Sequence, residues 1–217
     1  DSLTCQAVAI WDAIMYELII VGGGGHGVSV FQAVNSLKRY NVIGFVDKRS
    51  DAALARFGVK YLGTDDELDH ILRSNMKVVI GLGQKRSVHS RTAIAKKLEA
   101  KNANFPVIIA PSAFVSQYST IGKGTVVLNH AMVNADCQIG NFNIVNSGAI
   151  IEHGVAINDH VHIAPGAIIL GDVTIGAGSF IGAGAIIREG LRVGKKCIIA
   201  AGAFVNENVQ DGQVARR

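Results

Sequence analysis

Hydrophobic residues in the second half of the chain recur at a strict six-residue interval. Every sixth position from Ile109 to Val205 is Val or Ile, and the interval never slips. Neither an α-helix, with 3.6 residues per turn, nor an ordinary strand, with a period of two, produces this pattern. A fixed six-residue interval is typical of hexapeptide repeats that coil into a parallel β-helix. An all-β sandwich is the alternative, but its loops vary in length and would break the interval.

A second, slower period of 18 residues lies on top of the first. It is visible in a series of alanines: Ala113, Ala131, Ala149, Ala167, Ala185 and Ala203. Because 18 is three sixes, each coil has three faces, with Val and Ile pointing inward and small residues at the corners. The pattern predicts a triangular prism of about five coils, stacked at the strand spacing of about 4.8 Å.

The first half of the chain has a different pattern, in which short apolar runs alternate with helical periodicity. The first run ends in the turn G-G-G-G-H-G. Asp47 follows the second run, about 20 residues after this turn, and a Rossmann-like unit places an acid near a ribose at this position. The pattern predicts a small parallel sheet in a β-α-β-α-β-α unit. The expected strands are 18–21, 42–46 and 78–83, and the expected helices are 28–37, 65–73 and about 86–101.

These patterns divide the chain into three parts. Residues 1–14 fit neither pattern and are interpreted as a tag or upstream scar, with Met15 as a natural start. Residues 15–106 form the expected Rossmann-like domain, and residues 107–217 form the β-helix domain. The coils are expected to end near Val205, leaving 206–217 as a short polar tail.

Charge and cysteine content exclude several function classes. The net charge of +4 is mild and no block of like charges occurs, so nucleic acid is not an expected partner. The sequence contains no run of 18 apolar residues, so no membrane span is expected. Cys5, Cys137 and Cys197 form no metal or disulfide pattern, which favours a cytoplasmic protein.

The repeat places one histidine beside a backbone donor. His153 lies two residues after the inward position Ile151, near a corner, and Gly171 follows one coil later. The Gly171 N–H should therefore stack about 5 Å above His153. A base next to a free N–H suits acyl transfer, in which the base accepts a proton and the donor stabilises the oxyanion.

The other prism histidines do not extend this constellation within one chain. His162 lies half a coil after His153, on the opposite side of the prism, so only a neighbouring subunit could bring the two together. His130, His153, His160 and His162 fall on different faces, and no metal site is expected.

The glycine turn joined to a hexapeptide prism resembles a family of sugar acetyltransferases. The most specific segments are N-S-G-A-I-I-E-H, at 146–153, and H-V-H-I-A-P-G-A, at 160–167. They are similar to the left-handed β-helix enzymes related to the bacillosamine-pathway nucleotide-sugar N-acetyltransferase and the sialic acid O-acetyltransferase. The resemblance implies a left-handed β-helix, a homotrimer with active sites at subunit interfaces, and acetyl-CoA as co-substrate.

The resemblance also assigns residue roles. His153 is the implied general base. The implied nucleotide-sugar contacts are Gly24, Gly25, His26, Asp47, Lys48, Gly83 and Asn146. The implied acetyl-CoA contacts are His162, Gly171, Ala183 and Ala201, in the groove between adjacent prisms.

The chain departs from the family pattern at three points. Gly154 stands where the family has Asp or Glu after the histidine, which leaves Glu152, Asn146 or Asp159 to orient His153. Gln84 replaces an Asn, and the C-terminus lacks the usual G-x-P-A-K ending.

The expected function is acetyl transfer from acetyl-CoA to the amino group of a nucleotide-linked sugar. A UDP-linked 4-amino-4,6-dideoxy sugar for surface glycan or glycoprotein biosynthesis is the expected acceptor. O-acetylation of sialic acid or another sugar is an alternative, as is a non-catalytic scaffold that binds a nucleotide sugar. A zinc hydratase of the carbonic anhydrase type shares the prism and is a further alternative.

Overall fold

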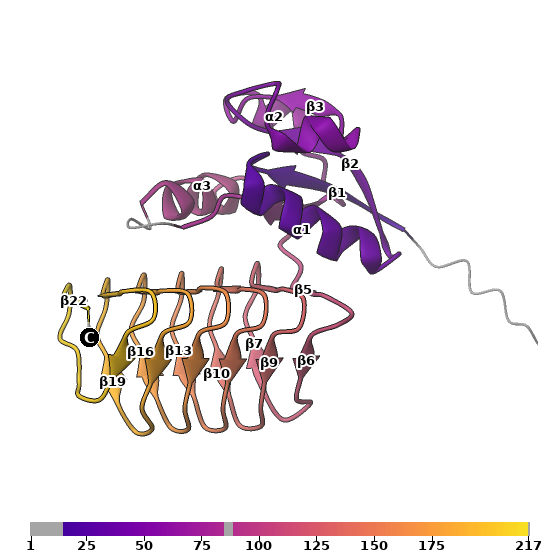
Figure 1. The fold of residues 1–217 in the computed structure, drawn as a ribbon. Coiled ribbons are helices and arrows are strands. Elements are labelled where there is room, and N and C mark those ends of the chain that lie inside the picture. Colours follow the sequence, from indigo (N-terminus) through magenta and orange to yellow (C-terminus); the bar gives the residue numbers. More distant parts are fainter. Residues whose placement is uncertain (1–14, 85–88, 217) are drawn as a thin grey trace, which may run out of the picture.

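The computed structural model describes residues 15–84 and 89–216, which form a small α/β domain placed over one face of a prism (Figure 1). The α/β domain has a parallel four-stranded sheet in the order β3-β2-β1-β4. Its strands are β1 (Tyr16–Val21), β2 (Tyr40–Val46), β3 (Tyr61–Gly63) and β4 (Lys77–Ile80). Its helices are α1 (Gly25–Ser36), the 3-10 helix η1 (Ala53–Phe57), α2 (Leu68–Ile71) and α3 (His89–Glu99).

Several boundaries differ from the sequence expectation. Helix α1 begins at Gly25 rather than Val28, so the glycine turn itself supplies the first helical turn. The helix expected at 65–73 is only α2, because Leu72 adopts an extended conformation. Strand β3 was not expected, since three residues are too short to show alternation. Part of the helix expected at 86–101 lies outside the described residues, as do residues 1–14.

The prism consists of two-residue strands that fall into three parallel sheets, one for each face. The first face, called here the covered sheet, contains β5 (Ile108–Ile109), β8 (Val126–Val127), β11 (Ile144–Val145), β14 (His162–Ile163), β17 (Phe180–Ile181), β20 (Ile198–Ile199) and β22 (Val214–Ala215). The second, the apolar sheet, contains β6 (Phe114–Val115), β9 (Met132–Val133), β12 (Ile150–Ile151), β15 (Ile168–Ile169), β18 (Ile186–Ile187) and β21 (Phe204–Val205). The third, the polar sheet, contains β7 (Thr120–Ile121), β10 (Gln138–Ile139), β13 (Ala156–Ile157), β16 (Thr174–Ile175) and β19 (Arg192–Val193).

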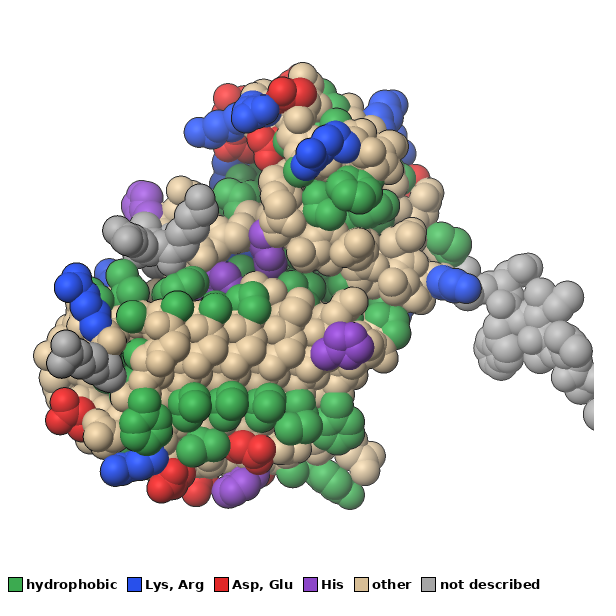
Figure 2. All heavy atoms as spheres, in the orientation of Figure 1, with side chains coloured by type: hydrophobic (Ala, Val, Ile, Leu, Met, Phe, Trp, Pro, Cys, Tyr) green, Lys and Arg blue, Asp and Glu red, His purple; other side chains and the backbone are tan. Residues whose placement is uncertain are grey.

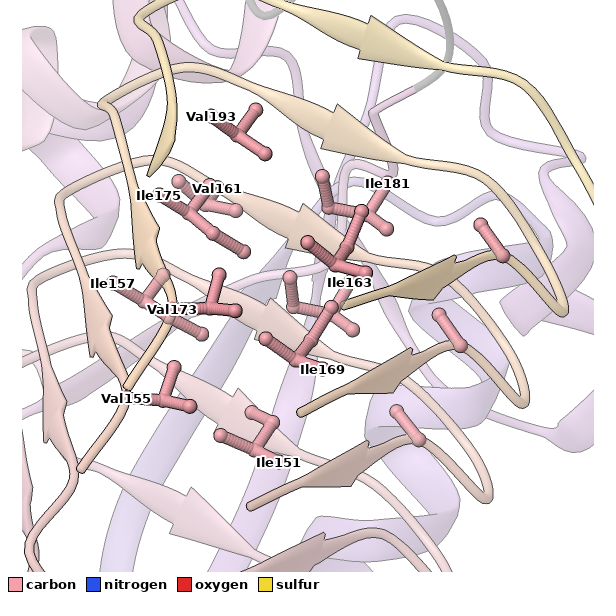
Figure 3. Packing of buried hydrophobic residues seen from close by; sticks show 14 of the residues in the cluster. Ile151, Val155, Ile157, Val161, Ile163, Ile169, Val173, Ile175, Ile181 and Val193 are labelled. Atoms are coloured by element: carbon pink, nitrogen blue, oxygen red, sulfur yellow. The ribbon is translucent and has the colours of Figure 1, made fainter. Parts of the chain in front are cut away.

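The inward hexad positions form the prism core, as the repeat predicts. Each strand pairs with the strand one coil later, so that Ile151 lies beside Ile169. From Val127 to Val205 every inward Val or Ile is buried, and Figure 3 shows the resulting aliphatic stacks. The corners are tight turns in which Gly148 and Gly166 both adopt φ of 66°, a conformation that favours glycine.

The prism is taller than expected, because its covered sheet has seven strands instead of about five. The expectation that 206–217 is a plain polar tail is wrong. Strand β22 pairs with β20, and Val209 forms a bridge to Val193 and is buried. These contacts cover the last coil, whose apolar end and strand edge would otherwise face solvent.

The outward residues give the three faces different surroundings. On the covered sheet, Ile108, Val126 and Ile144 share one buried cluster with Leu18 and Val30 of the α/β domain. The polar sheet presents mostly polar or small side chains: Thr120, Gln138, Ala156, Thr174 and Arg192.

The apolar sheet instead presents a ladder of large hydrophobic side chains: Phe114, Met132, Ile150, Ile168, Ile186 and Phe204. Phe114 and Phe204 at its two ends are 56% and 52% exposed. Figure 2 shows hydrophobic side chains in a row along the prism, just above an edge that carries charged and histidine side chains. A hydrophobic surface of this length is the kind that usually contacts another molecule.

Arg91 of α3 fixes the α/β domain to the prism. Its fully buried guanidinium donates hydrogen bonds to the carbonyls of Ile80 (3.0 Å), Leu82 (2.7 Å) and Phe142 (3.4 Å). Burial lowers the pKa of Arg91 to about 9, so the side chain remains protonated at neutral pH. Ile80 is the last residue of β4, Leu82 lies two residues further on and Phe142 lies at a prism corner, so this side chain bonds to both parts.

Across 15–84 and 89–216, no helix is long and apolar enough to cross a membrane.

Candidate active site

The glycine turn after β1 forms a backbone cradle at the start of α1. A side chain at Gly27 would collide with the Gly22 carbonyl, so strand and helix approach closely only because both positions are glycine. Gly24 and Gly25 are exposed, and a Cβ built at either one would meet nothing within 4 Å. The helix N-terminus therefore faces open space, where its N–H groups can donate hydrogen bonds to a phosphate.

A pocket of about 580 Å³ lies beside this turn, at the carboxyl ends of the strands. Gly22, Asp47 and Lys48 line it, together with apolar residues such as Val46 and Leu82. This is where open parallel sheets bind ligands. The pocket is large enough for a nucleoside, and its apolar wall suits a base.

Asp47 already has a structural task in this chain. Its carboxylate accepts hydrogen bonds from the Gly23 N–H (2.7 Å) and the Arg49 N–H (3.1 Å). Asp47 thus holds the glycine turn against the end of β2, and its predicted contact with a ribose would add to this role.

His26 and His162 meet where the two domains join. Their ring centroids are 6.4 Å apart, and Gly83 packs against His26, since a Cβ at Gly83 would lie 3.3 Å from the His26 Cβ. The Nδ1 of His162 lies 2.8 Å from the Gln84 carbonyl oxygen, and its Nε2 lies 3.1 Å from the Asn146 amide nitrogen. Because a carbonyl only accepts, Nδ1 carries the proton, and Nε2 accepts from Asn146.

Burial keeps both imidazoles neutral at physiological pH. Desolvation is the main cause that lowers the pKa of His26 to about 3 and that of His162 to about 4. The positive charge of Arg91 lowers both values further.

The predicted contact of His162 with acetyl-CoA stays a prediction. The side chain is 7% exposed, and both ring nitrogens have partners inside the chain. Asn146, predicted to touch the sugar, is half-buried and donates to His162. Within one subunit, His162 and Asn146 thus form a chain of hydrogen bonds from the segment after β4 to a corner of the prism.

The buried histidines make a testable contribution to acid sensitivity. In the unfolded chain a histidine binds a proton near pH 6.5, whereas in the folded chain His26 and His162 do so only near pH 3 and pH 4. The unfolded state therefore binds more protons below pH 6.5, and the free energy of unfolding falls as pH drops from 7 to 5. We expect the urea midpoint to fall over this range, and to fall less in His26→Gln. A surface control, His70→Gln, should retain the wild-type dependence, and equal slopes for all three proteins would contradict the assignment.

His153 lies at the corner between the apolar and polar sheets, and its side chain is exposed. Its ring packs against Gly171, because a Cβ built there would lie 2.7 Å from the ring Cε1 and 2.9 Å from Nε2. The carbonyl of Gly171 accepts from Gly190 N–H, but no described residue accepts a hydrogen bond from the Gly171 N–H. The base and the free donor that the repeat predicts are therefore neighbours in the structure.

The three residues expected to orient His153 have other partners. Glu152 accepts a hydrogen bond from the Asn134 amide (2.8 Å), and Asp159 accepts one from the Asn141 N–H (2.7 Å). Asn146 is bonded to His162. None of the three forms a hydrogen bond with the His153 ring, because the repeat fixes each of them at a different position on the prism.

Ala183 and Ala201 lie at a different corner from His153, between the covered and apolar sheets. They are exposed and stack directly, since the Gly202 N–H donates to the Ala183 carbonyl (2.8 Å). One chain therefore does not bring these alanines to His153. The apolar sheet separates them, and only a molecule that covers this sheet could contact both edges.

Two contributions to the site were not foreseen from the sequence. Arg91 and the Gln84 carbonyl are positioned by the meeting of the two domains, which no repeat signals. Asp172, by contrast, follows Gly171 directly and lies one coil above Gly154, so the 18-residue period could have indicated it. Among the described residues, no group of three His, Cys, Asp or Glu side chains could hold a metal ion.

Comparisons with known proteins agree with the fold of both domains. The family profile described as "PglD N-terminal domain" matches residues 17–98, and the profile "Bacterial transferase hexapeptide (six repeats)" matches residues 172–207. A comparison with curated protein sequences finds no significant match.

Solved structures resemble the chain over nearly its whole length. The acetyltransferase domain of PglB from Neisseria gonorrhoeae FA1090 is 31% identical, with a TM-score of 0.85, covering 91% of this chain and 95% of that one. The same domain in complex with acetyl coenzyme A gives a TM-score of 0.86, also at 31% identity, over 92% and 95% of the two chains. PerB from Caulobacter crescentus, in complex with CoA and GDP-perosamine, is 26% identical with a TM-score of 0.84, over 91% and 92%.

The prism, the glycine turn and these matches define a class of enzyme. The chain belongs to the left-handed β-helix acyltransferases of the hexapeptide-repeat family, in the group that carries a PglD-type N-terminal domain. It is an acetyltransferase, and the solved structures similar to it include a GDP-perosamine N-acetyltransferase from Caulobacter crescentus.

Proposed function

We propose that this enzyme transfers an acetyl group from acetyl-CoA to the amino group of a nucleotide-linked amino sugar. The observation that carries the proposal is the exposed His153 imidazole against Gly171, whose N–H has no acceptor among the described residues. A base with a free donor beside it is the minimum that amine acylation requires.

The α/β domain supports the nucleotide part of the proposal. Its open helix N-terminus suits a pyrophosphate, and the adjoining pocket can hold a base and ribose near Asp47 and Lys48. The PerB structure contains a nucleotide-linked amino sugar, GDP-perosamine, together with CoA. A UDP-linked 4-amino-4,6-dideoxy sugar is our first candidate for this chain's acceptor.

The apolar sheet supports a homotrimer with its active sites between subunits. Its ladder is uncovered in the single chain, and His153 lies along one edge while Ala183 and Ala201 lie along the other. A second copy packed on this ladder would form a groove along these edges. Acetyl-CoA would lie in this groove, with Gly171, His162, Ala183 and Ala201 as the proposed contacts.

In the proposed reaction the sugar amine attacks the thioester carbonyl carbon directly. The Gly171 N–H stabilises the negative charge that develops on the carbonyl oxygen. His153 accepts a proton from the attacking nitrogen as the new C–N bond forms. The C–S bond then breaks, and the departing CoA thiolate takes up this proton from His153, which restores the neutral base.

A thiol-release assay with acetyl-CoA tests the proposal. The acceptor panel contains UDP-, dTDP- and GDP-linked 4-amino-4,6-dideoxy sugars and free sialic acid. We expect turnover on at least one amino sugar and the acetamido product by mass spectrometry. Turnover on sialic acid alone would replace the proposal with O-acetylation, and binding without turnover on every acceptor would favour a non-catalytic scaffold.

A further inference from the structure

The corner that holds His153 contains a second, unpaired group one coil away. Asp172 follows Gly171 and is exposed, and its carboxylate forms no hydrogen bond or ion pair with any described residue. Its Oδ1 lies against the Cα of Gly154, where the side chain of any other residue would begin. The carboxylate thus points back toward the coil that contains His153.

The positions of the two side chains follow from the backbone. The Asp172 N–H donates to the His153 carbonyl (3.0 Å), so the coils are in register at this corner. The His153 ring leans toward the later coil and covers Gly171, while the Asp172 carboxylate leans toward the earlier coil and covers Gly154. His153 stacks on Gly171, and Gly154 stacks on Asp172 in the next position along the chain. Because consecutive Cα atoms are about 3.8 Å apart, the two side chains lie side by side between the same two coils.

Gly154 is the residue that makes room for this arrangement. Position 154 has φ of 69°, and the residues one coil away on either side, Asp136 (φ 62°) and Asp172 (φ 59°), adopt the same left-handed conformation as aspartates. The backbone at 154 is therefore one that Asp tolerates. A Cβ at position 154 would meet the Asp172 Oδ1, so a side chain there would require the Asp172 carboxylate to turn away from its present place.

We infer that Asp172 is the positioning residue for His153. The two side chains are not hydrogen-bonded in this structure, and rotation of the exposed Asp172 carboxylate would let it accept a hydrogen bond from the His153 Nδ1–H, leaving Nε2 to take the proton from the amine. This inference rests on the proposed acetyl transfer. Nδ1 is the ring nitrogen nearer to the His153 backbone and the farther of the two from Gly171, at 3.3 Å from the built Cβ position against 2.9 Å for Nε2. A carboxylate in this position fixes the tautomer and orientation of the base.

The first experiment measures the His153 tautomer without reference to activity. In ¹⁵N-labelled full-length protein at a pH where His153 is neutral, we expect the Nδ1–H form to dominate. In Asp172→Asn the population should shift toward the Nε2–H form. Asp136→Asn is the matched control, because that aspartate has the same conformation one coil on the other side of His153, and it should leave the tautomer unchanged. An unchanged tautomer in Asp172→Asn would overturn the inference even if acetyl transfer is confirmed.

The second experiment moves the carboxylate by one coil. In Asp172→Gly we expect kcat to fall by about tenfold or more, with KM for acetyl-CoA changed less than about twofold. Adding Gly154→Asp in the same protein places a carboxylate next to His153 again, in a backbone conformation that Asp accepts, and should restore much of kcat. A double variant no better than Asp172→Gly would overturn the inference. Wild-type protein inactive on every acceptor would instead refute the proposed function, and the tautomer measurement would still decide the role of Asp172.

Discussion

Replacement of His153 by asparagine is expected to lower kcat/KM for acetyl transfer by about 10²- to 10⁴-fold, the usual contribution of a positioned general base. Asparagine is polar and fills part of the space that the imidazole occupies beside Gly171, but it cannot accept a proton from an amine. Because the side chain is exposed at a corner and its ring has no hydrogen bond to a described residue, the fold should be unaffected. The measurement is thiol release with the acceptor identified in the panel, together with thermal unfolding.

His130→Asn is the matched control for this prediction. His130 is also an exposed corner histidine, with φ of 59° that asparagine adopts readily, and it lies at the corner between the covered and apolar sheets. We expect its activity to stay within about twofold of wild type, since it offers no base beside Gly171. Loss of less than tenfold in His153→Asn would mean that another group, or solvent, accepts the proton.

Replacement of Ile168 by glutamate is expected to convert the proposed trimer to monomers. Ile168 points outward near the middle of the apolar ladder, between Ile150 and Ile186. Three buried carboxylates without partners would cost more than an interface of ordinary size gains, since each isolated charge is penalised by several kcal/mol. Light scattering coupled to size exclusion should give a trimer for wild type and a monomer for the variant.

The same change should also lower acetyl transfer, by roughly 100-fold, because the proposed groove for acetyl-CoA exists only between two copies. Binding of the nucleotide sugar should persist, since the pocket beside Asp47 lies within one chain. Thr174→Glu, on the exposed polar sheet, is the control and should remain trimeric and active. A wild-type monomer with full activity would contradict this part of the proposal.

The prism itself was predictable from the sequence because its physics is local and repetitive. One inward Val or Ile every six residues and one small corner residue every 18 leave a coiling chain only one register, and the structure has that register from Ile109 to Val205. The same arithmetic placed His153 beside Gly171, because residues 18 apart occupy the same position on adjacent coils. Cys137 and Cys197 occupy the small-residue position of the repeat, and both are 1% exposed.

Short or irregular segments were predicted less well. Strand β3 and helix α2 have three and four residues, too few for a period to be visible, and their limits depend on the sheet they join. After Val205 the six-residue interval ends, yet Val209 and β22 still pack on the last coil. There the need to cover an exposed end replaces the repeat as the determining factor.

The sequence by itself determined the repeat, the fold of each domain and the pairing of His153 with Gly171, since these follow from spacing along the chain. Only the tertiary structure decided which face of the prism the α/β domain covers, and therefore which two faces remain free. It alone placed His162 between Gln84 and Asn146, because that contact joins residues 78 positions apart that no period connects. It also showed that Glu152, Asn146 and Asp159 have other partners while Asp172 does not, since hydrogen bonding depends on the direction of each side chain as well as on its place in the repeat.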